Sequence, residues 1–244
     1  MKQLVLGSLA YLVLGQLAGC IIDSDDDSGG AHATVTWSLQ ALATQSPQPC
    51  PVGYDTAAVY SQAIDQADNP VTDPIIDLFN CSDGSGVTST LPAATYAVTV
   101  AIATDDNALQ YGTSVPVFVD VNTDDTEVDV PPIYTDAGHL ELQWQLQDAS
   151  GAPLQCSDVP DAYSVNATAT DSAGTVASPP FDCDAPVGYT AGILAGSYTV
   201  AVALEDATGT QLGVAAPIDA TLQTDATHGN PITDLHVVTI VVTP

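Results

Sequence analysis

The chain of 244 residues contains an internal duplication, and this repeat constrains the fold more than any other feature of the sequence. Residues 32–40 read HATVTWSLQ, and residues 139–147 read HLELQWQLQ. Farther along, LPAATYAVTVAIA at 91–103 matches ILAGSYTVAVALE at 193–205. Repeats of roughly 20–50 residues would indicate a solenoid. A repeat of roughly 100 residues instead indicates two complete domains, each large enough to form its own core.

Apolar and polar residues alternate with a period of two in both copies, which is the pattern of a half-buried β-strand. Val35, Trp37 and Leu39 alternate with threonine and serine, and the segments after Tyr96 and Tyr198 alternate in the same way. Turn-forming stretches such as SDGSG, ASGAP and DATGT separate the runs. The pattern predicts an all-β chain of tandem antiparallel β-sandwiches, with no helix of useful length after residue 20.

The N-terminal segment has the parts of an export signal: Lys2, an apolar run that begins at Leu4, and small residues before a cysteine. The run is too short to be read as a membrane-spanning helix. Its ending, LAGC at 17–20, resembles the lipobox of bacterial lipoproteins. The resemblance implies that the signal is removed and that Cys20 is acylated. Because Ile21 follows in place of an aspartate, it also implies sorting to the outer membrane. The alternative is an ordinary secretory signal with an unrelated cysteine.

These signals predict the organisation of the whole chain. It comprises a signal peptide at 1–19, a lipidated Cys20 with an acidic flexible tether at 20–31, a first sandwich at 32–130, a linker at 131–138 and a second sandwich at 139–244. The tether is rich in Asp, Ser and Gly, a composition that stays solvated and does not form a core. The predicted location is the outer membrane, and the sequence leaves open whether the protein faces the periplasm or the exterior.

Charge excludes several classes of function. Lys2 is the only Lys or Arg in the chain, against 30 Asp and Glu residues. The body of the chain therefore contains no P-loop lysine, no Schiff-base lysine and no arginine clamp for phosphate. Binding to the nucleic-acid backbone also needs cationic side chains and is excluded. Because the like charges repel one another, we expect a high-salt medium or diffusely bound divalent cations to screen them.

One motif in both copies resembles a known group of β-sandwiches. LPAATYAVTV at 91–100 and ILAGSYTVAV at 193–202 are similar to the L-P-x-G-x-Y-x-V-x-V segment of prealbumin-like sandwiches. That group includes carboxypeptidase regulatory-like domains and collagen-adhesin B-type repeats. The second copy supplies the glycine, Gly196, where the first copy has Ala94. The resemblance implies an Ig-like or prealbumin-like sandwich, but a fold that serves many functions implies no particular activity.

The five cysteines divide into Cys20 for the lipid and two for each copy of the repeat. In an exported protein, Cys50 with Cys81 and Cys156 with Cys183 are predicted to form one disulfide within each sandwich. Each would close a loop of about 30 residues, a constraint worth ~3–4 kcal/mol of stability. The alternative is that these cysteines are free thiols or metal ligands.

The motifs of nucleophilic catalysis are missing from the sequence, since no G-x-S-x-G occurs. His32 and His139 begin equivalent strands and have no further ligands nearby in sequence. His228 and His236 lie close to aspartates, Asp225 and Asp234 respectively. We interpret them as surface histidines, with a metal site as the alternative.

An acidic turn provides one candidate cation site. If the three strands that begin at Tyr96 run up, down and up, Asp105, Asp106 and Asn107 lie where the linker leaves the first sandwich. Asp136 in the linker would then lie near them. Since Ca²⁺ prefers carboxylate and amide oxygens, we hypothesise a calcium site at the junction of the two sandwiches. The alternative is that these are solvated turn residues, and no other cofactor is predicted.

Together these observations predict a protein that is not an enzyme. We expect a membrane-anchored cell-envelope lipoprotein whose β-sandwiches act as a structural or adhesion-type interaction module, with an envelope protein or glycan as its partner. The alternative is an envelope binding module that depends on Ca²⁺ at the junction. A hydrolase with paired carboxylates is the third hypothesis, because aspartate is so abundant. The sequence does not determine the oligomeric state.

Overall fold

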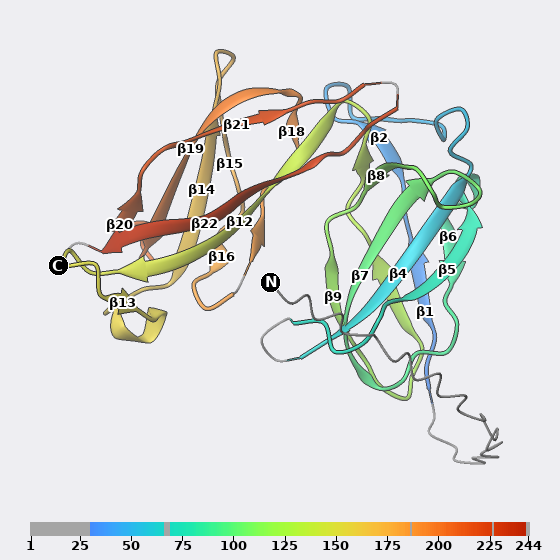
Figure 1. Ribbon diagram of the computed structural model, residues 1–244, viewed down its shortest axis with the longest axis horizontal. Helices are drawn as coiled ribbons and strands as arrows, with labels where there is room; N and C mark the ends of the chain where they lie inside the picture. The colour runs from blue at the N-terminus through green and yellow to red at the C-terminus, as the bar shows by residue number, and fades with distance from the viewer. Residues whose placement is uncertain (1–29, 66–68, 186, 226, 243–244) are drawn as a thin grey trace, which may run out of the picture.

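The computed structural model describes residues 30–65, 69–185, 187–225 and 227–242. The predicted signal peptide, Cys20 and most of the tether therefore lie outside the described residues. Within these ranges the regular structure is strand, apart from two short 3₁₀ turns, η1 (Cys81–Asp83) and η2 (Cys156–Asp158). The predicted all-β fold class is confirmed. Figure 1 shows the strands in two bodies, β1–β11 in one and β12–β22 in the other.

The first body consists of three sheets around one core. Its strands are β1 (Ala33–Thr36), β2 (Leu39–Ala41), β3 (Ser46–Pro47), β4 (Thr56–Ile64), β5 (Ile75–Asn80), β6 (Ser85–Val87), β7 (Ala94–Ala103), β8 (Gln110–Thr113), β9 (Val117–Val121), β10 (Thr126–Asp129) and β11 (Ile133–Tyr134). The sheets have the orders β10-β1-β6, β11-β2-β3 and β5-β4-β7-β8, and β9 also pairs with β7. In β7, every second side chain from Tyr96 to Ile102 is buried in the core, as the period of two predicted.

The second body is one continuous sheet folded around its own core. Its strands are β12 (Ala137–Gln147), β13 (Pro153–Leu154), β14 (Ser164–Thr170), β15 (Thr175–Ala177), β16 (Phe181–Asp182), β17 (Gly188–Tyr189), β18 (Ile193–Leu194), β19 (Gly196–Glu205), β20 (Gln211–Ala215), β21 (Ile218–Leu222) and β22 (Ile232–Val242). The main order is β13-β12-β22-β20-β19-β14-β15, with β16, β17, β18 and β21 paired at its sides. The core side of β19 runs from Tyr198 to Leu204 and is equivalent to that of β7.

The buried apolar residues form two separate clusters. One extends from Ala31 to Ile133 and the other from Leu140 to Ile240. Neither cluster, among the described residues, contains a member of the other. Each body thus buries its own apolar faces, and hydrophobic burial stabilises the two bodies through different sets of side chains.

The duplication extends from the sequence to individual hydrogen bonds. The Tyr96 hydroxyl donates to the carbonyl of Pro92 at 2.9 Å, and the Tyr198 hydroxyl donates to the carbonyl of Leu194 at 2.8 Å. In both cases a strand tyrosine binds the backbone four residues before it. A buried aromatic ring whose hydroxyl finds a partner avoids the cost of a desolvated polar group. The tyrosine of the shared motif is therefore a structural residue in both bodies.

Each body contains one disulfide, and the predicted pairing is confirmed. Cys50 is joined to Cys81, and Cys156 to Cys183, with sequence separations of 31 and 27 residues. The second cysteine of each pair, Cys81 or Cys183, is almost fully buried. The disulfides therefore fasten loops directly to the two cores.

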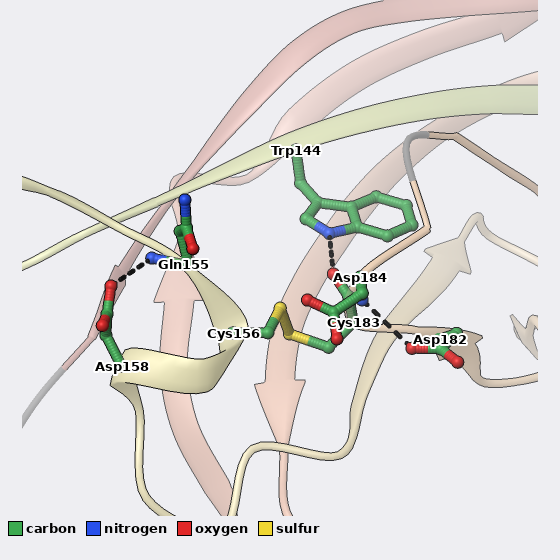
Figure 2. The surroundings of a disulfide bond; sticks show 7 residues. All are labelled: Trp144, Gln155, Cys156, Asp158, Asp182, Cys183 and Asp184. Atoms are coloured by element: carbon green, nitrogen blue, oxygen red, sulfur yellow. Dashed lines mark hydrogen bonds between the residues drawn. A yellow bond between two sulfur atoms is a disulfide. The ribbon is translucent and has the colours of Figure 1, made fainter. Parts of the chain in front are cut away.

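A tryptophan from the first strand segment of each repeat binds the backbone beside the disulfide. The Trp37 indole N–H donates to the carbonyl of Cys81, and the Trp144 indole N–H donates to the carbonyl of Cys183, both at 3.0 Å. Figure 2 shows Trp144 above the second disulfide, with its indole nitrogen directed at Cys183. Strand, tryptophan and disulfide thus form one unit in each body.

Only half of the predicted linker at 131–138 lies outside the sheets, because Ile133–Tyr134 form β11 and Ala137 and Gly138 begin β12. Ile133 pairs with Leu39 where β11 joins β2. Ala137 and Gly138 are the first residues of β12 and pair with β18. Backbone N–H and C=O groups next to a packed sheet gain hydrogen bonds by joining it. The two bodies are consequently joined with almost no free chain between them.

Two further features differ from the predicted antiparallel sandwiches. The first strand of each body takes part in a parallel pair, β1 with β10 and β12 with β22. The predicted strand at 32–40 is interrupted at Trp37 and Ser38, where the chain passes from one sheet to the next, whereas β12 is continuous. Alternation of side chains identifies a strand and its faces, but it carries no information on strand direction.

Candidate functional site

The two bodies meet where the loop before β22 reaches β8 of the first body (Figure 1). The N–H of Gly229 donates to the carbonyl of Tyr111 at 2.8 Å. The hydroxyl of Tyr54 donates to the carbonyl of Thr227 at 3.3 Å. Both contacts are made to or from the backbone of the loop, which therefore lies directly against β8.

Asn230 makes the most buried contact of the junction, with an exposed fraction of 2%. Its Oδ1 accepts from the N–H of Tyr134 at 3.2 Å, and its Nδ2 donates to the carbonyl of Thr113 at 2.5 Å. It thereby bridges β11 and β8. In the second body, β20 and β22 pair directly at the equivalent place. In the first body Pro131 and Pro132, which interrupt strand pairing, follow β10, and a side-chain amide from the second body closes the gap.

Two glycines allow the bodies to approach this closely. A Cβ on Gly112 would lie 2.5 Å from the carbonyl oxygen of Gly229. A Cβ on Gly229 would lie 2.3 Å from the ring of Tyr111. Any larger residue at either position would push the loop away from β8, so both glycines are required for the junction.

Two tyrosines and two carboxylates surround this contact. The rings of Tyr54 and Tyr111 lie 5.6 Å apart. Burial raises the pKa of Tyr111, and the carboxylates of Asp225 and Asp136 raise it further, so its hydroxyl stays protonated at neutral pH. The hydroxyl and N–H of Thr227 donate to Asp225 and lower the pKa of that carboxyl to about 2. The junction is therefore an uncharged aromatic contact beside two carboxyl groups, those of Asp225 and Asp136.

Replacing Asn230 with alanine is expected to lower the free energy of unfolding by about 1–3 kcal/mol, because it leaves the partly buried N–H of Tyr134 and C=O of Thr113 without this partner. Asn230→Asp should be at least as damaging, since a carboxylate oxygen would then face the carbonyl of Thr113. Urea unfolding measures the loss, and small-angle scattering reports whether the two bodies move apart. Asn122→Ala, at an exposed position, is the control and should change stability by less than about 0.5 kcal/mol. Equal stability of the two alanine variants would contradict the bridging role.

Asp136 lies between β11 and β12 and binds the backbone of the first body. Its Oδ1 accepts from the N–H of Leu42 at 2.6 Å, and its Oδ2 accepts from the N–H of Ala43 at 3.1 Å. Both oxygens thus hold the turn after β2. Within the described ranges, no group of three or more His, Cys, Asp or Glu side chains is arranged to hold a metal ion.

The other residues of the calcium hypothesis form a local turn. The hydroxyl of Thr104 donates to Asp106 at 2.6 Å, and Asn107 donates to the hydroxyl of Tyr60 at 2.7 Å. Asp105 is exposed beside them. The structure therefore does not bring Asp105, Asp106 and Asn107 together with Asp136 as one set of ligands.

The equivalent histidines, His32 and His139, have the same contact. Nδ1 of each lies 2.8 Å from a backbone carbonyl, that of Thr88 or Thr190. His139 is 3% exposed, and its Nε2 is buried without a hydrogen-bond partner. Burial lowers the pKa of His139, and the carbonyl of Thr190 opposes this effect only in part. A neutral imidazole that supports the backbone is a structural residue.

The two exposed histidines are not brought together. His228 pairs with Asp225 at 3.3 Å, and His236 pairs with Asp234 at 3.0 Å. Each aspartate is a close sequence neighbour of its histidine, so both pairs form within a single turn or bulge. The interpretation as surface histidines agrees with this geometry.

Many of the acidic residues have a local role in turns. Oδ1 of Asp148 accepts from the N–H and the hydroxyl of Ser150, and Oδ1 of Asp206 accepts in the same way from Thr208. The hydroxyl groups, together with backbone N–H groups, lower the pKa values of both carboxyls. Hairpin turns of this kind use an ionised aspartate without any cation.

Asn230 and Tyr111 were not identified from the sequence. The pair Asn230-Pro231 signals a turn, and the pair Tyr111-Gly112 lies in a predicted strand. Nothing in their spacing indicates that the turn of one repeat binds the strand of the other. Such a contact depends on how the two bodies are oriented, which local patterns do not encode.

Comparisons with known proteins give only distant likenesses. No protein-family model and no curated protein matches the chain. Among solved structures, a leucine-rich repeat protein from Bacteroides thetaiotaomicron has a TM-score of 0.39 and 12% identity over 88% of this chain and 26% of its own. A streptococcal ancillary pilin has a TM-score of 0.30 and 12% identity over 89% and 64%. The fimbrial anchor protein Mfa2 from Porphyromonas gingivalis has a TM-score of 0.27 and 9% identity over 87% and 90%. This chain thus spans about a quarter and just under two thirds of the first two proteins, and likenesses with TM-scores below 0.5 carry no functional argument.

In the part of the chain that the structure describes, no helix has the length and apolar composition needed to cross a membrane.

Proposed function

We propose that this protein is a lipid-anchored protein of the cell envelope whose two sandwiches act as a non-catalytic structural or interaction module. The observation that carries the proposal is the duplicated set of side chain–backbone hydrogen bonds. His32, Trp37 and Tyr96, with their equivalents in the second body, each bind a backbone carbonyl. Histidine and tyrosine often take part in catalysis, but at these positions they bind the backbone and support the fold.

The anchoring part of the proposal is supported by the LAGC motif at 17–20, which resembles a lipobox. Several acyl chains on one cysteine would hold the protein firmly at a bilayer, since each buried CH₂ contributes ~0.8 kcal/mol. The acidic residues that follow would keep the sandwiches away from the lipid surface. An outer-membrane location and an envelope protein or glycan as the partner complete the proposal.

Replacing Cys20 with serine is expected to move the protein from the membrane fraction to the soluble fraction or to leave it as an uncleaved precursor. Fractionation of cells that produce each form, with mass spectrometry of the N-terminal peptide, measures both outcomes. Ser28→Ala in the tether is the matched control and should stay at the membrane. A Cys20→Ser variant that is processed and partitions with membranes like the original protein would overturn the lipid anchor.

A further inference from the structure

Among the described residues, strand β5 has no strand partner along one of its edges. It pairs with β4 over six consecutive residues, from Ser61↔Ile75 to Thr56↔Asn80, without any shift of register. It is the end strand of its sheet, and it is the longest described strand that pairs on one side only. An edge of this kind presents unpaired N–H and C=O groups that can accept another strand.

The second body protects the equivalent edge. There the partner strand of β14 is split into β15 and β16. Between them three residues, 178–180, oppose only two residues of β14, which is a β-bulge. Two of the three are Pro179 and Pro180, which have no N–H to offer to an added strand. The chain therefore contains one protected and one open version of the same edge.

The outward face of β5 is apolar. Ile76 and Leu78 have exposed fractions of 47% and 54%. On the neighbouring strand β4 they lie opposite Tyr60 and Ala58, so these four side chains share one face. The chain has a net charge of −29, so an uncharged surface beside an open strand edge is unusual. Every second side chain of a strand added at this edge would pack against that surface.

The inward face of β5 contains a carboxylate oxygen without a partner. Asp77 lies between Ile75 and Phe79, both of which pack against the core of the first body. Its Oδ1 accepts from the hydroxyl of Ser89 at 2.5 Å, whereas its Oδ2 is buried and has no hydrogen-bond partner among the described residues. Leaving a buried acceptor unpaired costs free energy. A neighbouring donor, above all a cationic one, would remove that cost.

The unpaired Asp77 oxygen also makes some strands unfavourable partners for the edge of β5. A neutral strand placed beside β5 would bury Asp77 further without pairing it, which is unfavourable. A second copy of this chain could not supply a lysine or arginine from its sandwiches, because its only Lys or Arg is Lys2 in the predicted signal peptide. Asp77 thus acts against self-association and in favour of a basic partner.

We propose that the open edge of β5 binds an extended segment of a partner polypeptide by strand addition, with a Lys or Arg of that segment beside Asp77. The backbone of β5 supplies the hydrogen bonds, Ile76 and Leu78 contact alternate side chains of the added strand, and Asp77 selects for positive charge. This inference rests on the proposed function as an interaction module, and it assigns that function a site and a class of partner.

The test uses the full chain in detergent and two designed peptides of alternating threonine and valine, one with a central lysine and one with glutamine in its place. Fluorescence anisotropy should show the lysine peptide binding about tenfold more tightly, or better, because a charge-assisted bond replaces an unpaired buried oxygen. Asp77→Asn should remove that preference. Hydrogen exchange should show new protection at residues 75–80 when the lysine peptide is bound.

Leu78→Glu, which puts a charge on the outward face of β5, should weaken binding of both peptides at least tenfold. Val176→Glu on β15 is the matched control, since it adds the same charge at the protected edge and should bind like the original chain. Unchanged tryptophan fluorescence verifies that the variants are folded, because Trp37 lies next to the first disulfide and Trp144 next to the second.

The proposal is overturned if neither peptide binds, if both bind the original chain equally, or if Asp77→Asn keeps the preference for lysine. Crosslinking to envelope components in intact cells separates this result from failure of the proposed function. If the original chain and Leu78→Glu capture the same components equally, the module stands and β5 is not its site. If neither captures any component, the interaction function itself fails.

Discussion

Replacing both cysteines of either disulfide with alanine is expected to lower the free energy of unfolding by about 3–4 kcal/mol. The reason is the entropy that the unfolded chain regains when a loop of 31 or 27 residues is no longer closed. The pairs to replace are Cys50 with Cys81 and Cys156 with Cys183. A loss of this size is a large fraction of the total stability of an ordinary domain.

The protein offers one tryptophan beside each disulfide, so the two losses can be measured separately. In a Trp144→Phe background the fluorescence of Trp37 reports the first body, and in a Trp37→Phe background Trp144 reports the second. Urea unfolding of each variant then gives the free energy for the body that lost its disulfide. Variants that unfold at the same urea concentration as their parents would mean that the disulfides add no stability.

The second large effect is expected from core truncation at equivalent positions of the repeat. Ile102→Ala in β7 and Leu204→Ala in β19 remove fully buried side chains, one from each core. Each should lower the free energy of unfolding by about 2–5 kcal/mol, through lost burial and the cavity left behind. Because no described residue belongs to both cores, each loss should be largest in the transition of its own body.

Exposed residues supply the controls for this experiment. Leu109→Ala in the first body and Val237→Ala in the second remove apolar side chains that are 63% and 54% exposed, and they should change stability by less than about 0.5 kcal/mol. The same tryptophan signals serve as the readout. If Ile102→Ala and Leu204→Ala shift both transitions equally, the two bodies unfold as one unit and the junction at Asn230 couples them strongly.

The sequence was a good guide wherever a property depended on local pattern. The alternation after Tyr96 and Tyr198 predicted buried strands, and both strands are there. The compartment implied by the N-terminus, together with even numbers of cysteines in each copy, predicted both disulfides. The same patterns did not predict that β10 and β22 pair in parallel with β1 and β12, or that part of the segment 131–138 forms strands. In those places the outcome depends on which distant strand is available for pairing.

For the candidate sites, too, the sequence indicated local features but not contacts between distant residues. The sequence suggested loop carboxylates as neighbours of Asp136, whereas its hydrogen-bond partners are the N–H groups of Leu42 and Ala43, which lie far away in sequence. Asn230 and the open edge at Asp77 had no sequence signal of their own. Their importance appears only when strands from different parts of the chain lie next to each other.

The amino-acid sequence by itself thus determined that this chain forms strands in two similar copies, with one disulfide in each copy and no lysine or arginine after residue 2. Those properties follow from composition, periodicity and the count of cysteines, which are the same in any conformation. Tertiary structure alone decided how the copies are joined through Asn230 and which strand edge stays open, because hydrogen-bond satisfaction and burial depend on neighbours that only folding brings together.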